Sequence, residues 1–176
     1  MRTYLDLFEI PGVKRLVVSA LPGRLAYGMI ALATFFFVQD KTGSITLARI
    51  ATGVETITSS LTAGFRGNLI DKWGQTRPLS IFVPSWVALV IVLSSVSTPT
   101  AIVVVSGLIG LMSPPVNLST RPLWRVLVGP ENLRTAYALD TTISSSTIVA
   151  GPVLATAISI QYSGSAALWV TAALMA

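Results

Sequence analysis

The sequence contains no cysteine and no histidine, and only 11% of its 176 residues are charged. The first absence excludes disulfides and thiolate metal sites, and the second excludes acid–base catalysis by imidazole. A soluble domain of ordinary composition has about 25% charged residues. Because 52% of the residues here are hydrophobic, we predict a membrane protein rather than a soluble enzyme, and we expect no metal or other cofactor.

Apolar runs long enough to cross a bilayer separate the charged clusters. A hydrocarbon core of about 30 Å requires roughly 20 residues of helix. We predict one all-α domain over residues 1–176, with membrane helices near 16–38, 46–65, 78–96, 100–118, 141–160 and 165–176. The last helix has about 12 residues, roughly 18 Å at 1.5 Å per residue, and is expected to be incomplete. The pair Pro114–Pro115 is expected to disturb the fourth helix.

The loop charges predict the orientation of these spans. With a cytoplasmic amino terminus, nine basic residues fall on the cytoplasmic side, and two fall on the opposite side. The nine are Arg2, Lys14, Arg15, Arg66, Lys72, Arg77, Arg121, Arg125 and Arg134, and the two are Lys41 and Arg49. Basic residues concentrate in cytoplasmic loops of membrane proteins. We therefore predict a multi-pass protein of the cell membrane with its amino terminus in the cytoplasm, and the net charge of +5 gives no reason to expect a nucleic-acid partner.

After the second predicted span we expect a basic loop from Arg66 to Arg77, which reads GNLIDKWGQTR from 67 to 77. Its glycines permit a tight turn, and its carboxylate and basic groups can pair with helix ends or with opposite charges. The segment resembles the signature loop of the major facilitator superfamily, G-x-L-x-D-[RK]-x-G followed by basic residues. The matching positions are Gly67, Leu69, Asp71, Lys72, Gly74 and Arg77. Gln75 and Thr76 depart from the pattern, where the family has at least one more basic residue.

A second resemblance to the same family lies in the fifth predicted span, where Gly151–Pro152 forms a pair that the family often carries in this helix. Proline removes a backbone hydrogen bond and glycine admits a close neighbouring helix, so the pair marks a bend or a contact point. The resemblance implies the amino-terminal six-helix half of a twelve-helix transporter, whose substrate the sequence does not identify. It implies alternating access, usually coupled to a proton or ion gradient, and a partner in the missing carboxy-terminal half.

Two charged residues interrupt the apolar runs, and ionisable groups at membrane depth usually face a cavity or a partner. Glu55 heads a polar helical stripe that continues through Ser59, Thr62 and Arg66. It is a candidate proton carrier, or else a structural group packed between helices. Arg24 could extend its head group to the cytoplasmic face, line the cavity and contact an anionic solute, or pair with Glu55.

The basic loops also contain candidates for a latch, which in the family joins helices and halves through cytoplasmic charges. By resemblance, the candidates are Asp71, Arg77, Arg121 and Asp140. From the sequence alone, Asp140 suits a capping role at a helix start, and it could equally pair with Arg121 or Arg125. We expect Trp73, Trp124 and Tyr137 to anchor the membrane interface.

Two other classes of function were weighed against transport. A membrane-embedded protease requires a serine–histidine pair, two carboxylates at one depth or zinc ligands; histidine is absent, and Glu55 and Asp140 belong to different depths. A truncated remnant or an assembly module is the other alternative, suggested by the short sixth helix. Six further spans encoded after Ala176 would favour the transporter, and an immediate stop codon would favour the remnant.

The predicted orientation can be tested with reporter fusions. We expect alkaline phosphatase, which is active only outside the cytoplasm, to be active when fused after Gly43 and inactive when fused after Asp71, because the basic segments stay in the cytoplasm. The reverse pattern would contradict the orientation.

Overall fold

The computed structural model describes residues 4–176, and this part of the chain is built from helices alone. The helices are α1 (Tyr4–Glu9), α2 (Val13–Thr42), α3 (Ile45–Trp73), α4 (Thr76–Ser95), α5 (Pro99–Leu111), α6 (Val116–Leu127), α7 (Leu133–Gln161) and α8 (Gly164–Met175). Arg2, which contributes to the predicted cytoplasmic charge, lies outside the described residues.

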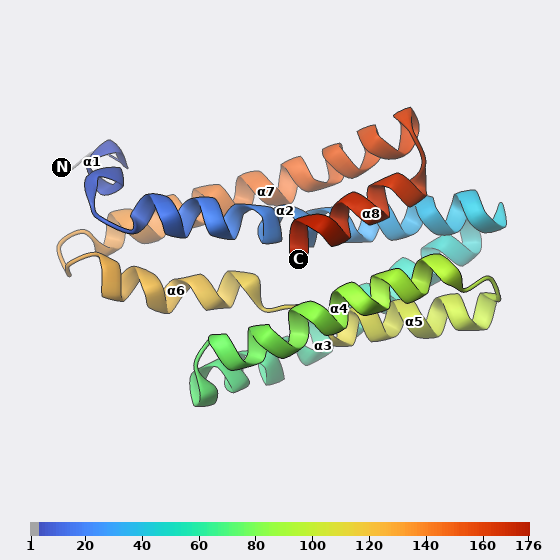
Figure 1. Ribbon diagram of the computed structural model, residues 1–176, viewed down its shortest axis with the longest axis horizontal. Helices are drawn as coiled ribbons and strands as arrows, with labels where there is room; N and C mark the ends of the chain where they lie inside the picture. Colours follow the sequence, from blue (N-terminus) through green and yellow to red (C-terminus); the bar gives the residue numbers. More distant parts are fainter. Residues whose placement is uncertain (1–3) are drawn as a thin grey trace.

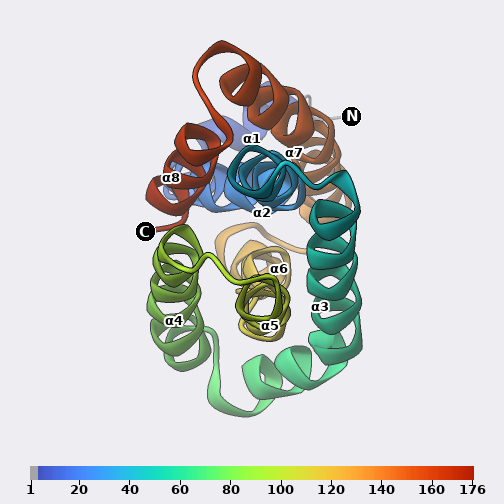
Figure 2. The ribbon, with the colours of Figure 1, turned by 90° about the vertical axis from the view of Figure 1, so that its right-hand side faces the viewer.

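The long helices run roughly along one axis in two groups (Figure 1). In one group α2 packs against α7 and α8, and in the other α3 packs against α5. Viewed from the end, α5 and α6 lie below α2, with α3 and α4 on either side of them (Figure 2). The helices therefore form one bundle in which α2, which also contacts α3 and α6, is central.

The connections between helices gather at the two ends of the bundle. One end carries the start of α2, the α3–α4 turn and the α6–α7 connection, and the other carries the α2–α3, α4–α5 and α7–α8 connections (Figure 1). Of the nine basic residues predicted on the cytoplasmic side, Arg66 is buried and Arg2 is not described. The seven that remain are exposed and belong to the first end: Lys14, Arg15, Lys72, Arg77, Arg121, Arg125 and Arg134. Exposed Lys41 and Arg49 belong to the second end, so the charge asymmetry of the sequence is also an asymmetry of the bundle.

The helices differ from the predicted spans most clearly at three places. Helix α3 continues to Trp73, and α7 already begins at Leu133. The fourth predicted span is divided, since α5 ends at Leu111 and α6 begins at Val116. Pro114 and Pro115 lack the N–H groups that would bond to the carbonyls one turn earlier, so the prediction that they disturb the helix is confirmed.

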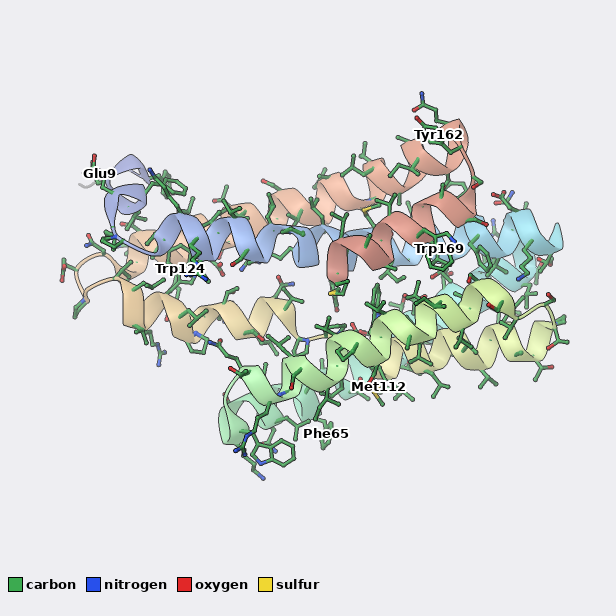
Figure 3. All side chains as sticks on the ribbon, in the orientation of Figure 1. Glu9, Phe65, Met112, Trp124, Tyr162 and Trp169 are labelled. Carbon is green, nitrogen blue, oxygen red and sulfur yellow. The ribbon has the colours of Figure 1, made fainter. Side chains whose placement is uncertain are left out.

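Among the described residues, four helical stretches are long and apolar enough to cross a membrane: α2, α4, residues 99–127 and α7. Helix α8 is apolar but shorter. Helix α3, the predicted second span, is long enough to cross a membrane, but it is too polar to count among these four stretches. Its charged Glu55 and Arg66 are buried against other helices, whereas Phe65, which is 63% exposed, points away from the bundle (Figure 3). A helix that buries its charged side chains in the bundle and exposes its apolar ones is suited to a lipid environment.

Close helix crossings are made by glycines. A Cβ atom on Gly151 of α7 would lie 2.6 Å from the backbone of Gly28 on α2. A Cβ atom on Gly110 of α5 would lie 2.1 Å from the carbonyl oxygen of Glu55 on α3. One turn away, Thr58 of α3 donates a hydrogen bond of 2.9 Å to the Gly107 carbonyl. Small residues allow helix backbones to approach closely in membrane proteins, and here they fix the α2–α7 and α3–α5 pairs.

Two clusters of buried apolar side chains fill the remaining space. The larger cluster joins α2, α3, α4, α5 and α8 and includes Phe37, Trp86 and Leu168. The smaller one joins the start of α2 to α1, α6 and α7 and includes Leu7 and Trp124. The two clusters therefore lie on opposite sides of the break between α5 and α6.

The glycine crossing predicts opposite effects for two matched substitutions. Gly151→Ala should destabilise the bundle by about 1–3 kcal/mol, because its methyl group would collide with the Gly28 backbone. Gly64→Ala on α3 has no neighbour within 4 Å, and it should be neutral or stabilising because alanine favours helix. Thermal unfolding of the purified protein in detergent would measure both. Equal effects of the two changes would show that the crossing is looser than described.

Candidate functional site

A buried ion pair joins α2 to α7. The Nη2 atom of Arg24 lies 2.5 Å from Oδ1 of Asp140, and the two side chains are 3% and 10% exposed. The same Nη2 donates to Oγ1 of Thr120 on α6 at 2.7 Å. Oδ1 of Asp140 also accepts a hydrogen bond of 2.9 Å from the indole of Trp124 on α6. One carboxylate and one guanidinium thus tie together three helices, α2, α6 and α7.

This geometry corrects the predictions for Arg24. The arginine neither extends to the cytoplasmic face nor pairs with Glu55, because its guanidinium is held inside the bundle by Asp140. Glu55 instead lies next to Thr34 of α2. Thr34 is ten residues beyond Arg24, about 15 Å along the helix, so the two charges lie too far apart to pair.

The same geometry corrects the alternatives for Asp140 and the role of Trp124. Helix α7 begins at Leu133, so Asp140 lies in its third turn and cannot cap its start. Its ion-pair partner is Arg24 rather than Arg121 or Arg125. Trp124 is 1% exposed and lies on the side of α6 that faces α2 (Figure 3), so it is a buried hydrogen-bond donor and not an interface anchor.

A groove of about 680 Å³ opens beside Asp140 at the basic end of the bundle. It is bounded by the end of α3, by α6 and by the start of α7. Among its lining residues are six that the sequence singled out: Gly67, Asp71, Arg121, Arg125, Tyr137 and Asp140. Arg125 donates a hydrogen bond of 3.0 Å from Nε to the hydroxyl of Tyr137. Within residues 4–176, Asp140 is paired with Arg24, but no ion pair involves Asp71, Arg121 or Arg125.

The other residues of the signature pattern lie outside the groove. Helix α3 includes Leu69 and ends just after Lys72, at Trp73. Gly74 then adopts a φ of 72°, a left-handed conformation that favours glycine. Arg77 is exposed in the first turn of α4. The expectation of a loop beginning at Arg66 is therefore wrong, since only residues 74 and 75 separate the two helices.

A second cavity, of about 200 Å³, contains Glu55. Tyr27, Ser59, Ser60 and Trp86 are among the residues that line it with Glu55. Thr34 of α2 lies next to the carboxyl group, but its hydroxyl and Oε2 of Glu55 are both buried without a hydrogen bond of normal geometry. A buried carboxyl group next to a polar cavity can hold and release a proton.

Arg66 is a buried charged residue whose role the sequence did not identify. It is 4% exposed, and it donates hydrogen bonds from α3 to the end of α5. Its Nη1 atom bonds to the carbonyls of Ser113 and Gly110, the latter at 3.5 Å. Its Nη2 atom bonds to the carbonyl of Ser59 at 2.6 Å. The helical stripe from Glu55 through Ser59 to Arg66 contained the signal, but assigning Arg66 to a loop obscured it.

The chain is similar to a protein of Sinorhizobium fredii named "Uncharacterized MFS-type transporter y4rN", in which MFS denotes the major facilitator superfamily. The two are 29% identical over 158 residues, which make up 87% of this chain and 39% of the relative. The chain thus spans well under half the length of the curated relative that it matches. No family model matches the chain. No solved structure matches it either.

The ion pair predicts a marked asymmetry between single and double substitutions. Arg24→Gln should destabilise the protein by about 3–5 kcal/mol, because it leaves the carboxylate of Asp140 buried without a counter-charge. Adding Asp140→Asn should recover much of that loss, since the buried charge disappears. Arg15→Gln, at an exposed position on the same helix, is the matched control and should have little effect. Unfolding in detergent would measure all three, and a single variant no less stable than the control would rule out a structural role for the pair.

Proposed function

We propose that the chain forms the amino-terminal six-helix half of a secondary transporter of the major facilitator superfamily, which moves a small solute across the cell membrane by alternating access. The observation that carries the proposal is the groove at the basic end of the bundle. There Gly67 and Asp71 of the signature pattern lie with Arg121, Arg125 and Asp140. The similarity to a protein named as an MFS-type transporter supports the same family.

The groove suits a gate that opens and closes at one membrane surface. Its walls belong to α3, α6 and α7, which are separate in sequence. Its exposed charges make no ion pair with one another in the described chain, so they remain available to a partner. We propose that this partner is a second six-helix half, and that contacts with it form and break during the transport cycle.

The buried ion pair would give this gate a rigid wall. Arg24 and Asp140 hold α2 and α7 together, and Thr120 and Trp124 attach α6 to both. Alternating access in transporters is largely a rigid-body motion of one helical unit against another. Helices α2, α6 and α7, which this buried charge network ties together, are suited to move as such a unit.

The exposed basic residues support an orientation for the proposed transporter. The seven at the groove end outnumber Lys41 and Arg49 at the other end. Because basic residues remain in the cytoplasm, we place the groove at the cytoplasmic surface of the cell membrane. The gate would therefore control the inward-facing side.

Glu55 is the proposed site of proton coupling. It is 5% exposed and lines a cavity with polar side chains from α2 and α3. A carboxyl group in this setting gains or loses a proton as the cavity opens to water or closes. Proton movement through the protein could in this way be linked to movement of the solute.

Uptake into proteoliposomes would test this function. The complete gene product should take up at least one member of a panel of sugars, drugs and organic anions, and its rate should depend on pH. Glu55→Gln keeps the shape of the side chain but cannot release a proton, so it should flatten that pH dependence, whereas Glu131→Gln, at an exposed position, should preserve it. An unchanged pH profile in Glu55→Gln would refute proton coupling at Glu55, and absence of uptake of any solute would count against transport.

A further inference from the structure

A third cavity, of about 220 Å³, lies where the fourth predicted span is broken. Its lining comes from α2, α3, the break itself and the first turn of α6. The lining residues are Tyr27, Ala63, Arg66, Pro114, Pro115, Val116, Asn117 and Leu118. Arg66 is the one charged residue in this set, and no carboxylate lines the cavity.

The charge of Arg66 lacks a counter-ion. Within the described residues no carboxylate lies within ion-pair distance of it, although the residue is only 4% exposed. Four hydrogen bonds use its two terminal nitrogens, and all of them end on uncharged oxygens. Its Nε atom is buried without a partner. A buried positive charge without a negative partner is costly, so a negatively charged ligand would be stabilised here.

The start of α6 offers a second donor beside the same cavity. The N–H groups of Val116 and Leu118 bond to the carbonyls of Pro114 and Pro115, which leaves the N–H of Asn117 without such a bond. Helix α6 is 12 residues long, and no side chain caps its first turn. The first backbone N–H groups of a helix have no partner within the helix, and the helix dipole makes this end positive. The proline break therefore turns an uncapped helix start toward the cavity that Arg66 lines.

We propose that this cavity binds a small oxyanion, the carboxylate or phosphate group of a negatively charged solute. The anion would accept hydrogen bonds from Nε of Arg66 and from the backbone N–H of Asn117, in the cavity that Tyr27 also lines. Half-helices that begin inside a membrane point their amino ends at anionic substrate groups in other transport proteins. The identification of this anion with the transported solute rests on the proposed function, whereas the binding of an anion at the cavity does not.

The hydrogen bonds from Arg66 to the carbonyls of Gly110 and Ser113 also serve the fold, since they join α3 to the break after α5. That structural role accounts for Nη1 and Nη2 but not for Nε. It also does not account for the polar Asn117, whose Oδ1 is buried without a partner at the same cavity. A ligand at the cavity would provide a partner for Nε, and water or a protonated ligand could provide one for the amide oxygen.

The oxyanion site lies next to the cavity of Glu55. Tyr27 lines both cavities, and Ser59, which accepts hydrogen bonds from Arg66, lines the cavity of Glu55. A proton bound at Glu55 would remove a negative charge close to the anion. This arrangement favours binding of proton and anion together, which is the condition for carrying both in one direction.

Binding can be measured on the purified protein in detergent by calorimetry and by thermal unfolding. Sodium acetate and inorganic phosphate are the probes, and sodium chloride at equal ionic strength is the reference. At least one of the two oxyanions should bind and raise the unfolding temperature, whereas chloride should not. Acetate alone would identify a carboxylate site, and phosphate alone a phosphate site. An equal effect of all three salts would overturn the proposal.

The substitution Asn117→Asp distinguishes a loss of anion binding from a loss of folding stability. A carboxylate in the first turn of α6 is favourable to the helix dipole, so stability should be kept. The same carboxylate would occupy or repel the anion, so oxyanion affinity should fall at least about tenfold, the effect of losing a hydrogen bond to a charged group. Asn68→Asp, an identical change at an exposed position outside the cavity, should leave affinity unchanged.

The outcomes distinguish this site from the transport function. Unchanged oxyanion affinity in Asn117→Asp would refute the site. Uptake of a neutral or cationic solute without oxyanion binding would overturn the anion site and leave the transporter standing. Oxyanion binding that Asn117→Asp abolishes, without uptake of any solute, would support the site and count against transport.

Discussion

The constraint on which the structure depends is that polar groups surrounded by lipid must find their partners within the protein. The buried charges obey it in different ways. The terminal nitrogens of Arg24 bond to Asp140 and Thr120, and those of Arg66 bond to the carbonyls of Gly110, Ser113 and Ser59. The many serine and threonine hydroxyls of α3 and α7 donate back to carbonyls of their own helix, as Thr62 does to Thr58 at 2.8 Å. Among the described residues, Nε of both arginines and Oε2 of Glu55 are buried without a hydrogen-bond partner, and Arg66 and Glu55 each line a cavity.

The same constraint explains why the polar groups concentrate in a few places. Away from them the helices are joined by apolar clusters and by glycine crossings such as Gly28 with Gly151. These contacts hold the helices together without requiring hydrogen bonds. The polar networks then lie at the groove, at the helix break and around Glu55, where the proposed function requires charge.

The sequence predicted the helical bundle and much of the site, because both depend on local patterns. Apolar runs located the helices, and the proline pair located the break in the fourth. The signature pattern located Gly67 and Asp71, which the structure brings to one groove with Arg121 and Asp140. Local patterns could not predict the partner of Arg24. Asp140 is 116 residues away, and the pairing depends on how α2 and α7 cross. Arg66 was misjudged because the basic residues after it suggested a loop, although its spacing from Glu55 placed it on the polar face of α3.

The interrupted fourth span divides the bundle mechanically. On one side of residues 112–115, α5 is fastened to α3 by Gly110 and by the bond from Thr58 to Gly107. On the other side, α6 is fastened to α2 and α7 through Thr120 and Trp124. Backbone torsions in such a short irregular segment can absorb rotation that a continuous helix would resist. The two sides could therefore pivot about this joint while each kept its own packing intact.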